Sequence, residues 1–307
     1  MIEVNNLSRL YGNLIAVNSV NFKIEKGEVV GLLGHNGAGK TTIMKMLTGY
    51  LEPSSGSISI DGLEIGLDTD LIQKKIGYLP ENCPVWPEMT VIDYLEYQAL
   101  LHKMNPNSVP ELIHKAINKT ALQEKATSSI QTLSRGYRQR VGVAQALLHM
   151  PDIIILDEPT NGLDPTQILH MRDLIRELAE TATIIVSTHV LQEVQAVCER
   201  VLIMRSGKLV TDSKISHLRA SSRLLLTIEN TNVNIIDELK KIGSVGDVEK
   251  KSDNNSIQVF QIDTTEDLAP TIVESLVSLG VKIRGVNPER RDLETVFSEV
   301  SLEAHNE

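Results

Sequence analysis

The chain of 307 residues is acidic, with a net charge of −10, and 41% of its residues are hydrophobic. That composition is typical of a globular protein, and the length predicts two domains, each able to bury its own core. A chain this acidic, without a dense Lys/Arg run, is not expected to bind nucleic acid, although one local pocket can still hold a phosphate ligand.

The two cysteines, Cys83 and Cys198, show no metal-ligand spacing, which favours reduced thiols in a cytoplasmic protein over a disulfide or a metal site. The sequence does not open with a basic and apolar leader, and no run approaches the ~18–20 apolar residues of a membrane span. Any role at a membrane is therefore expected to be peripheral.

Apolar periodicity predicts the first elements in chain order. Alternation at Val20–Ile24 and at Ile58–Ile60 predicts strands. The short apolar run Val29–Leu33 predicts a further strand, which a glycine-rich turn joins to a helix that begins near Lys40. Helical signals then dominate from about Val91 to Leu148.

Continuous apolar runs follow this helical stretch. Ile153–Leu156 and Thr183–Val186 predict buried strands, a helix is expected around Ile168–Leu178, and Val201–Met204 predicts a last strand. Such alternation indicates an α/β domain over residues 1–215, with a mostly parallel sheet, an N-terminal β region and a helical insertion at about 88–150.

The sequence changes in character beyond Arg219. The order β-α-β-β-α-β plus a tail helix indicates a small ferredoxin-like α+β domain over residues 220–307, with the boundary at Ile215–Ser222. The expected segments are Leu224–Ile228, Ile235–Ile242, Val245–Glu249, Ile257–Ile262, Leu268–Leu279, Val281–Val286 and Arg291–Val300.

The run Gly34-His35-Asn36-Gly37-Ala38-Gly39-Lys40-Thr41 fits the pattern G-x-x-x-x-G-K-[ST] between a predicted strand and helix. Glycines let successive backbone N–H groups turn toward phosphate oxygens, and the helix N-terminus adds favourable partial charge. Lys40 can reach the β- and γ-phosphates, and the Thr41 hydroxyl can bind Mg²⁺. The alternative is a tight turn followed by a solvated lysine.

Asp157-Glu158 follows an apolar strand, and ligands collect at the carboxyl ends of parallel strands. Asp157 is placed to hold Mg²⁺, directly or through water, and Glu158 to polarise a water for attack on the γ-phosphate. The alternative for this pair is a helix-capping role. His189 also follows a strand, where a neutral imidazole can bond the γ-phosphate and orient the water, although a lone histidine is more often structural or solvated.

These residues resemble the nucleotide-binding domain of ABC transporters, over roughly Met1–Ser213, which implies a P-loop NTPase fold. Thr132-Leu133-Ser134-Arg135-Gly136-Tyr137 stands where that family has its LSGGQ signature. Asn161-Gly162-Leu163-Asp164-Pro165 resembles its D-loop, and Tyr11 occupies the place of the aromatic that stacks on adenine.

The resemblance implies ATP and Mg²⁺ as cofactors and assigns residues to them. Glu158, His189 and Lys40 are expected in catalysis, and Thr41, Glu81 and Asp157 at the metal. The residues expected to bind ATP are Tyr11, Gly34, His35, Asn36, Gly37, Ala38, Gly39, Lys40, Thr41, Thr42, Ser134, Gly136 and Asp164.

The resemblance also implies partners. Two such domains join head to tail around two ATP molecules, so that Ser134 and Gly136 touch the γ-phosphate held by the partner's loop, and Asp164 connects the two sites. Because each motif occurs once, the chain needs a second copy of itself or a paralogue. A separate transmembrane permease is the other expected partner.

Three positions depart from the family pattern. Arg135 and Tyr137 replace Gly and Gln of the signature, and Arg135 adds a charge near the expected phosphate. Glu81 stands where the family usually has Gln; it can still bind Mg²⁺ but brings a further negative charge. The stretches YLPE, LSRGYRQR and DEPTNGLDP are most similar to the ABC-2 export group, including gliding-motility-type ATPases, and the region with Asp292–Phe297 resembles an accessory domain of that group.

The sequence therefore predicts an ATPase that powers an ABC-2-type exporter from the inner, cytoplasmic face of the membrane. One alternative is a soluble ABC ATPase acting on ribosomes or DNA, whose relatives carry two cassettes or long insertions that this chain lacks. The other is a non-hydrolysing, nucleotide-gated regulator. Four intact residues argue against it, Lys40, Asp157, Glu158 and His189, whereas Arg135 and Glu81 leave it open.

Overall fold

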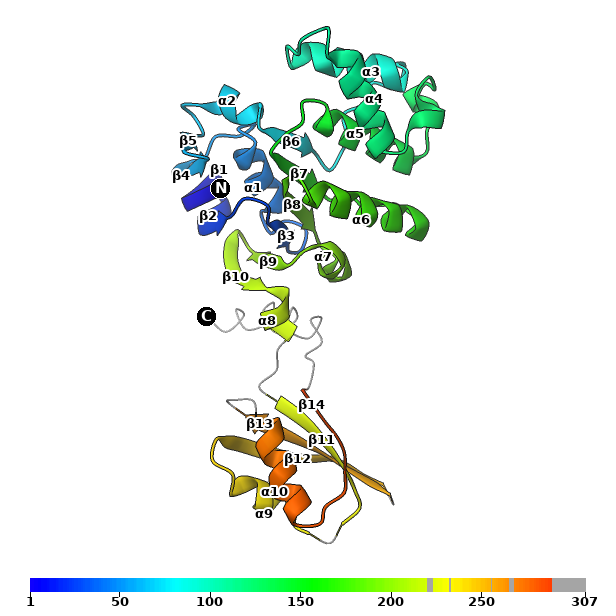
Figure 1. Ribbon diagram of the computed structural model, residues 1–307. Helices are drawn as coiled ribbons and strands as arrows, with labels where there is room; N and C mark the ends of the chain where they lie inside the picture. The colour runs from blue at the N-terminus through cyan, green and yellow to red at the C-terminus, as the bar shows by residue number, and fades with distance from the viewer. Residues whose placement is uncertain (220–222, 232, 255, 265–267, 289–307) are drawn as a thin grey trace. The chain divides into compact units, whose positions relative to one another are not determined.

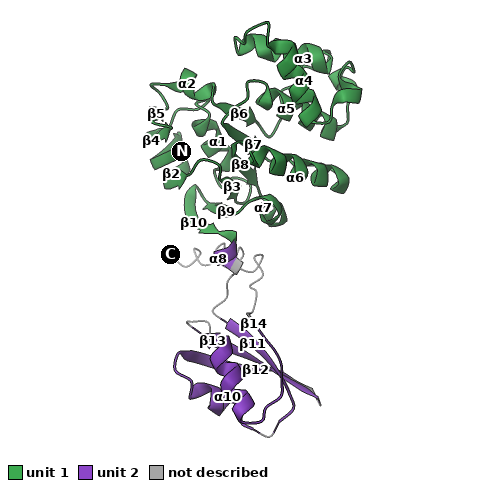
Figure 2. Ribbon diagram, viewed as in Figure 1, with its two compact units in different colours: residues 1–215 green, residues 216–307 purple. Residues whose placement is uncertain are grey.

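The computed structural model describes residues 1–219, 223–231, 233–254, 256–264 and 268–288. The chain divides into two compact units, Met1–Ile215 and Ser216–Glu307 (Figure 2). Each unit has its own buried hydrophobic core.

A six-stranded sheet forms the centre of the first unit (Figure 1). Its strand order is β10-β9-β3-β8-β7-β6, and every neighbouring pair is parallel except the edge pair of β9 and β10. The residues of β7 and β8 are all buried, as expected of strands covered on both faces. The strands are β3 (Val29–Leu33), β6 (Ile76–Leu79), β7 (Ile153–Asp157), β8 (Thr183–Thr188), β9 (Arg200–Arg205) and β10 (Lys208–Lys214).

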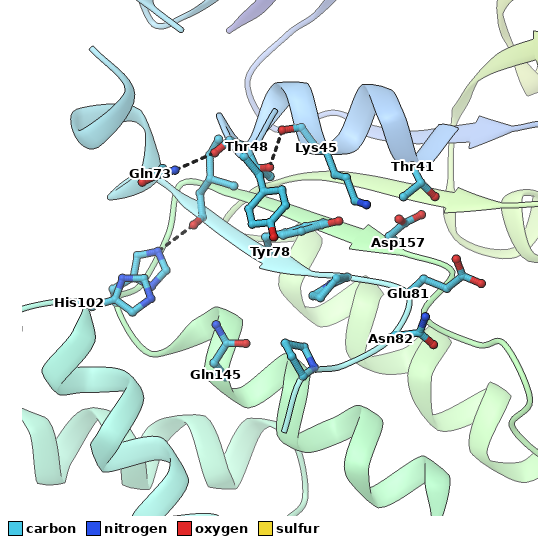
Figure 3. Close-up of a pocket in the computed structure, with 15 residues that line it drawn as sticks. Thr41, Lys45, Thr48, Gln73, Tyr78, Glu81, Asn82, His102, Gln145 and Asp157 are labelled. Atoms are coloured by element: carbon cyan, nitrogen blue, oxygen red, sulfur yellow. Dashed lines mark hydrogen bonds between the residues drawn. The ribbon is translucent and has the colours of Figure 1, made fainter. Parts of the chain in front are cut away.

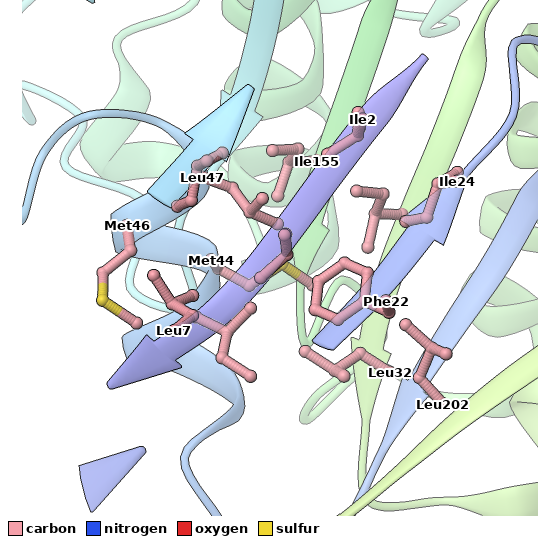
Figure 4. Packing of buried hydrophobic residues seen from close by; sticks show 14 of the residues in the cluster. Ile2, Leu7, Phe22, Ile24, Leu32, Met44, Met46, Leu47, Ile155 and Leu202 are labelled. Atoms are coloured by element: carbon pink, nitrogen blue, oxygen red, sulfur yellow. The ribbon is translucent and has the colours of Figure 1, made fainter. Parts of the chain in front are cut away.

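A smaller antiparallel sheet of order β2-β1-β4-β5 shares one core with helix α1 and the central sheet. Figure 4 shows Phe22 of β2, Met44 of α1 and Leu202 of β9 in this cluster. Burying such side chains contributes about 1.5–3 kcal/mol each. The elements are β1 (Ile2–Tyr11), β2 (Leu14–Ile24), α1 (Lys40–Leu47), β4 (Ser55–Ile60), β5 (Leu63–Glu64) and α2 (Thr69–Gln73).

The other face of the central sheet packs against α5 (Arg135–Leu147), α6 (Pro165–Ala179) and α7 (Leu191–Val197). Alternate residues of a strand point to opposite faces. In β7, Ile155 accordingly belongs to the core around α1, whereas Leu156 belongs to the core around α6.

The helical insertion has a third core of its own. It contains α3 (Val91–Leu101), α4 (Val109–Lys119), α5 and two short 3-10 helices, Gln123–Lys125 and Ile130–Thr132. Helix α5 anchors the insertion, because its Val141 packs inside the insertion while its Val143 packs against the central sheet.

The second unit is an antiparallel sheet of order β12-β13-β11-β14 whose core includes two helices. Leu239 of α9 and Ile272 of α10 share this core with Leu226 and Phe260. The elements are α8 (Ile215–Arg219), which spans the unit boundary, β11 (Arg223–Glu229), α9 (Ile235–Lys240), β12 (Val245–Asn254), β13 (Ile257–Thr264), α10 (Ala269–Ser278) and β14 (Ile283–Pro288).

The predicted fold class is confirmed, including the ferredoxin-like order of the second unit. The expectation that Val201–Met204 is the last strand of the first unit is wrong, because β10 follows it. This edge strand alternates exposed and half-buried positions, so it has little apolar signal. The predicted tail helix Arg291–Val300 and the segment Asp292–Phe297 lie outside the described residues.

Candidate active site

The glycine-rich loop joins β3 to α1 through two left-handed backbone positions. Gly37 and Gly39 have φ angles of 83° and 103°, which residues with a side chain rarely adopt. A Cβ on Gly39 would also lie 2.5 Å from the carbonyl oxygen of Ala16. The loop ends at the N-terminus of α1, where free N–H groups and the helix dipole favour an anion.

Lys40 is the first residue of α1, and only 6% of its surface is exposed. Its ammonium group donates to the carbonyl oxygens of Gly34, at 2.7 Å, and His35, at 3.3 Å. The same nitrogen lies 3.4 Å from Oε1 of Glu158. The loop therefore surrounds the ammonium group of Lys40, which faces the Glu158 carboxylate directly after strand β7.

The ends of β7 and β8 lie side by side because their parallel register sets Asp157 opposite Ser187. The Ser187 hydroxyl donates to Oδ1 of Asp157. The backbone N–H of Glu158 donates to both the carbonyl and the hydroxyl oxygen of Ser187, each at 3.1 Å. Sequence reasoning missed Ser187, whose signal is a polar residue at the carboxyl end of an apolar strand.

Glu158 is held in a sparsely populated conformation, with φ at 51° and 5% of its surface exposed. Such backbone strain persists only where surrounding contacts fix it, and it is common in active sites. Oε2 of Glu158 lies 2.9 Å from Nδ1 of His189, whose side chain is 42% exposed. One carboxylate thus contacts a buried lysine on one side and an accessible histidine on the other.

The surroundings of Asp157 fit a divalent cation. Asp157 is fully buried, and its Oδ2 atom has no hydrogen-bond partner among the described residues. A buried carboxylate oxygen without a partner is costly, and a metal ion offsets that cost. Thr41 and Glu81 line the same cavity of about 530 Å³, and Figure 3 shows the three side chains gathered at one end of it. Oxygen donors of this kind suit Mg²⁺.

Tyr78 lines the same cavity, and the pKa of its hydroxyl reflects the electrostatic potential there. Burial raises the pKa of its hydroxyl, and the negative charges of Asp157 and Glu81 raise it further. The phenol therefore stays protonated, and the acids give this end of the cavity a negative potential that favours a cation.

A second cavity, of about 590 Å³, opens over the glycine loop. Tyr11, 45% exposed, stands at its wall with the Arg9 guanidinium 4.9 Å from the ring centroid. The exposed Leu14 and Ile15 extend this wall, and sequence reasoning missed both, although an exposed apolar pair after a turn is a visible signal. Flat apolar surface beside a phosphate loop suits a purine base.

The structure brings most predicted site residues together. The predicted residues that line the second cavity are Tyr11, Asn36, Gly37, Gly39, Lys40, Thr41, Thr42, Glu81 and Glu158. Gly34 and His35 supply carbonyl oxygens to Lys40, and Ala38 is buried beneath the loop.

Three predicted residues lie elsewhere, at the starts of two helices. Ser134 caps α5 by accepting from the N–H of Tyr137 at 3.4 Å, and Asp164 caps α6 by accepting from the N–H of Gln167 at 3.0 Å. Neither of them lines the cavity over the glycine loop, nor does Gly136.

The loop, its lysine and the acids at the end of β7 define a P-loop nucleoside triphosphatase. A sequence profile of the ABC transporter family matches residues 17–161. The ABC transporter ATP-binding protein MJ1023 of Methanocaldococcus jannaschii is 38% identical over 218 residues, which cover 71% of this chain and 79% of the relative. The bacitracin transport ATP-binding protein BcrA of Bacillus licheniformis is 32% identical over 87% of this chain and 94% of the relative.

A solved structure agrees. The dimeric, post-hydrolysis ATP-binding cassette MJ0796, bound to ADP and phosphate, is 26% identical with a TM-score of 0.64, covering 70% of this chain and 99% of that one. The chain belongs to the ATP-binding proteins of ABC transporters, and it is an ATPase. The predicted family, P-loop fold and enzyme class are confirmed.

Proposed function

We propose that this chain is the ATP-hydrolysing subunit of an ABC-2-type exporter. The observation that carries the proposal is the placement of Glu158, which lies between Lys40 and His189 at the edge of the cavity over the glycine loop. An acid held there by a strained backbone is suited to accept a proton from a water that attacks the γ-phosphate.

The other residues take the roles that phosphoryl transfer requires. The loop N–H groups and Lys40 hold the β- and γ-phosphates and offset the charge that develops on them. His189 keeps the Glu158 carboxylate aimed and offers its second ring nitrogen to the γ-phosphate. Tyr11, with Leu14 and Ile15, receives the adenine ring.

Thr41, Asp157 and Glu81 are the residues that would hold Mg²⁺. When bound, the ion neutralises phosphate charge. Glu81 replaces a neutral amide of the family pattern, and its additional negative charge strengthens cation binding at this position.

Ser134, Gly136 and Asp164 complete the site of a second copy. Their absence from the lining of the chain's own cavity supports this role. The capped start of α5 presents free N–H groups that suit a phosphate. Head-to-tail pairing of two chains would then place one Lys40 loop opposite the other chain's Ser134 in each of two sites.

A permease partner is supported by apolar surface on the helical insertion. None of the described helices is long and apolar enough to cross a bilayer. Trp86 is 54% exposed, and its ring meets that of Tyr97 of α3 edge to face, with 6.0 Å between the ring centroids. Leu100 and Leu101, one turn further along α3 from Tyr97, are exposed as well. Such a patch fits an apolar helix of a membrane subunit, which would hold the chain at the membrane.

The first experiment compares Glu158→Gln with the unaltered chain. Light scattering after size exclusion measures solution mass with and without Mg-ATP, and phosphate release measures turnover. We expect the variant to form an ATP-dependent dimer and to lose turnover, because the amide cannot accept the proton. Glu180→Gln, an exposed change beyond α6, is the matched control and should behave like the parent.

The outcomes separate the candidate functions. A variant that binds ATP but stays monomeric, with an active parent, would contradict self-pairing. A parent that binds ATP without turnover would favour the nucleotide-gated regulator instead.

A further inference from the structure

Arg135, the charged residue in the signature position, packs on the D-loop of its own chain. A Cβ on Gly162 would lie 2.5 Å from Cζ and 2.9 Å from Nε of Arg135, with Nη1 also in contact. The guanidinium therefore covers a glycine whose φ is 71°. Arg135 is exposed, and among the described residues its N–H groups form no hydrogen bond or salt bridge, so its contact with Gly162 is one of packing.

A second side chain makes the reverse contact. Gln167, in the first turn of α6, covers Gly136 of the signature, because a Cβ there would lie 3.0 Å from Nε2 of Gln167 and closer still to the rest of its amide. Arg135 at the start of α5 thus covers Gly162, just before α6, and Gln167 in the first turn of α6 covers Gly136 in α5. The start of α5 and the start of α6 interlock.

Helix electrostatics do not explain an arginine at this position. Arg135 is the first residue of α5, and the first turn of this helix has no acidic residue. Positive charge at a helix N-terminus is unfavourable, since the dipole already places positive partial charge there. The contact with Gly162 gives the side chain a different role.

We propose that Arg135 and Gln167 are positioning residues that lock the signature segment Ser134–Gly136 to the D-loop Asn161–Pro165. This inference rests on the proposed function, in which both segments face the second copy. The lock makes the phosphate-contacting N–H groups of α5 and the Asp164 carboxylate move as one body. Pairing with a nucleotide-loaded partner then orders both segments in a single step.

The test uses the full chain with Arg135→Ala, Arg135→Met, Arg135→Lys, Gln167→Ala and the Arg135→Ala/Gln167→Ala double variant. Fluorescent ATP measures binding to the Lys40 loop, phosphate release measures kcat and KM, and light scattering in a Glu158→Gln background measures pairing. Arg138→Ala removes the same charge from the same helix and is the control. Thermal midpoints identify any variant that folds poorly.

We expect Arg135→Ala to lower kcat and the ATP-dependent pairing about tenfold while nucleotide binding stays unchanged. Arg135→Met, which still covers Gly162, should recover most of the loss, and Arg135→Lys, which lacks the flat group, should recover less. In the double variant, the fold-decrease in kcat and in pairing should be smaller than the product of the two single fold-decreases, because either substitution alone already disrupts the interlock.

Two results would overturn the inference. Unchanged pairing in all variants of an active parent would show that the interlock has no role. Full recovery by Arg135→Lys but not Arg135→Met, with a loss that fades at high salt, would show that Arg135 acts as a charge on phosphate. An inactive parent would instead refute the proposed function.

Discussion

The two units use polar residues in opposite ways. In the first, parallel strands end at the same edge of the sheet, so polar residues after β3, β7 and β8 converge on one place. In the second, neighbouring strands are antiparallel, and polar residues pair across the sheet instead. Arg223 bonds Asp263 at 2.7 Å, and Arg284 bonds Glu229 at 3.0 Å.

This difference shows where chemistry can arise. Charges paired on a sheet surface satisfy one another and contribute little to stability. Asp157, Glu158 and Lys40 are instead buried, and Oδ2 of Asp157 has no hydrogen-bond partner among the described residues. Substitutions of the polar residues at the ends of β3, β7 and β8 should therefore change ATP turnover. Substitutions in the second unit should change only the free energy of unfolding.

The largest effect is expected from Lys40→Ala. The substitution removes the buried cation that the glycine loop surrounds, so turnover should fall about a hundred- to a thousandfold and nucleotide binding should weaken. Phosphate release and equilibrium binding measure the two effects. Lys26→Ala, in an exposed turn, is the matched control. An equal loss of turnover in that variant would contradict the specific role of Lys40.

Leu226→Ala tests the second unit. Leu226 is fully buried in that core, and its truncation should cost about 2–5 kcal/mol of unfolding free energy. Turnover below the unfolding temperature should not change. Denaturant unfolding and phosphate release together check this, with the half-buried Leu225→Ala on the other sheet face as the milder control. A parallel fall in turnover would mean that the site depends on the second unit.

Ser187→Ala tests the support beneath the acids. It removes the donor to Asp157 and one acceptor of the Glu158 N–H, so turnover should fall about ten- to a hundredfold, as it does for other supporting bonds at metal sites. Steady-state kinetics at varied Mg²⁺ should show a higher metal requirement. Ser213→Ala on β10 serves as the control, and an unchanged metal requirement would argue against the assigned cation position.

His149→Gln should have the smallest effect and change only the pH dependence of stability. Burial, with the neighbouring His102 charge, lowers the pKa of His149 from 6.5 to about 4, and its Nε2 lies 3.0 Å from the Ile76 carbonyl oxygen. The unfolded chain then binds a proton that the folded chain does not, so stability is full above pH 6.5 and falls toward pH 4. The parent should lose at most about 1.4 kcal/mol per pH unit in this window through this group.

Unfolding midpoints of parent and variant between pH 7.5, about one unit above that window, and pH 4.5, near its lower end, measure this contribution. The glutamine can still donate to the Ile76 carbonyl oxygen, so the comparison isolates the titration. Identical pH dependence in the two proteins would contradict the assignment.

The sequence by itself determined the local features of this protein. Gly34–Thr41 requires backbone angles that only glycine adopts readily, and the apolar runs at Val29–Leu33 and Ile153–Leu156 require buried strands. These signals predicted β3, α1 and β7, with Lys40 at the start of α1 and Glu158 directly after β7, because backbone preference and burial depend on neighbouring residues.

Only the tertiary structure decided which distant residues meet. The parallel register sets Ser187 beside Asp157, and close packing of two helix starts seats Arg135 on Gly162. The edge strand β10 forms because β9 offers it hydrogen bonds, although its own residues carry little apolar pattern. Register and packing depend on the whole sheet and its helices, so no local stretch of sequence contains them.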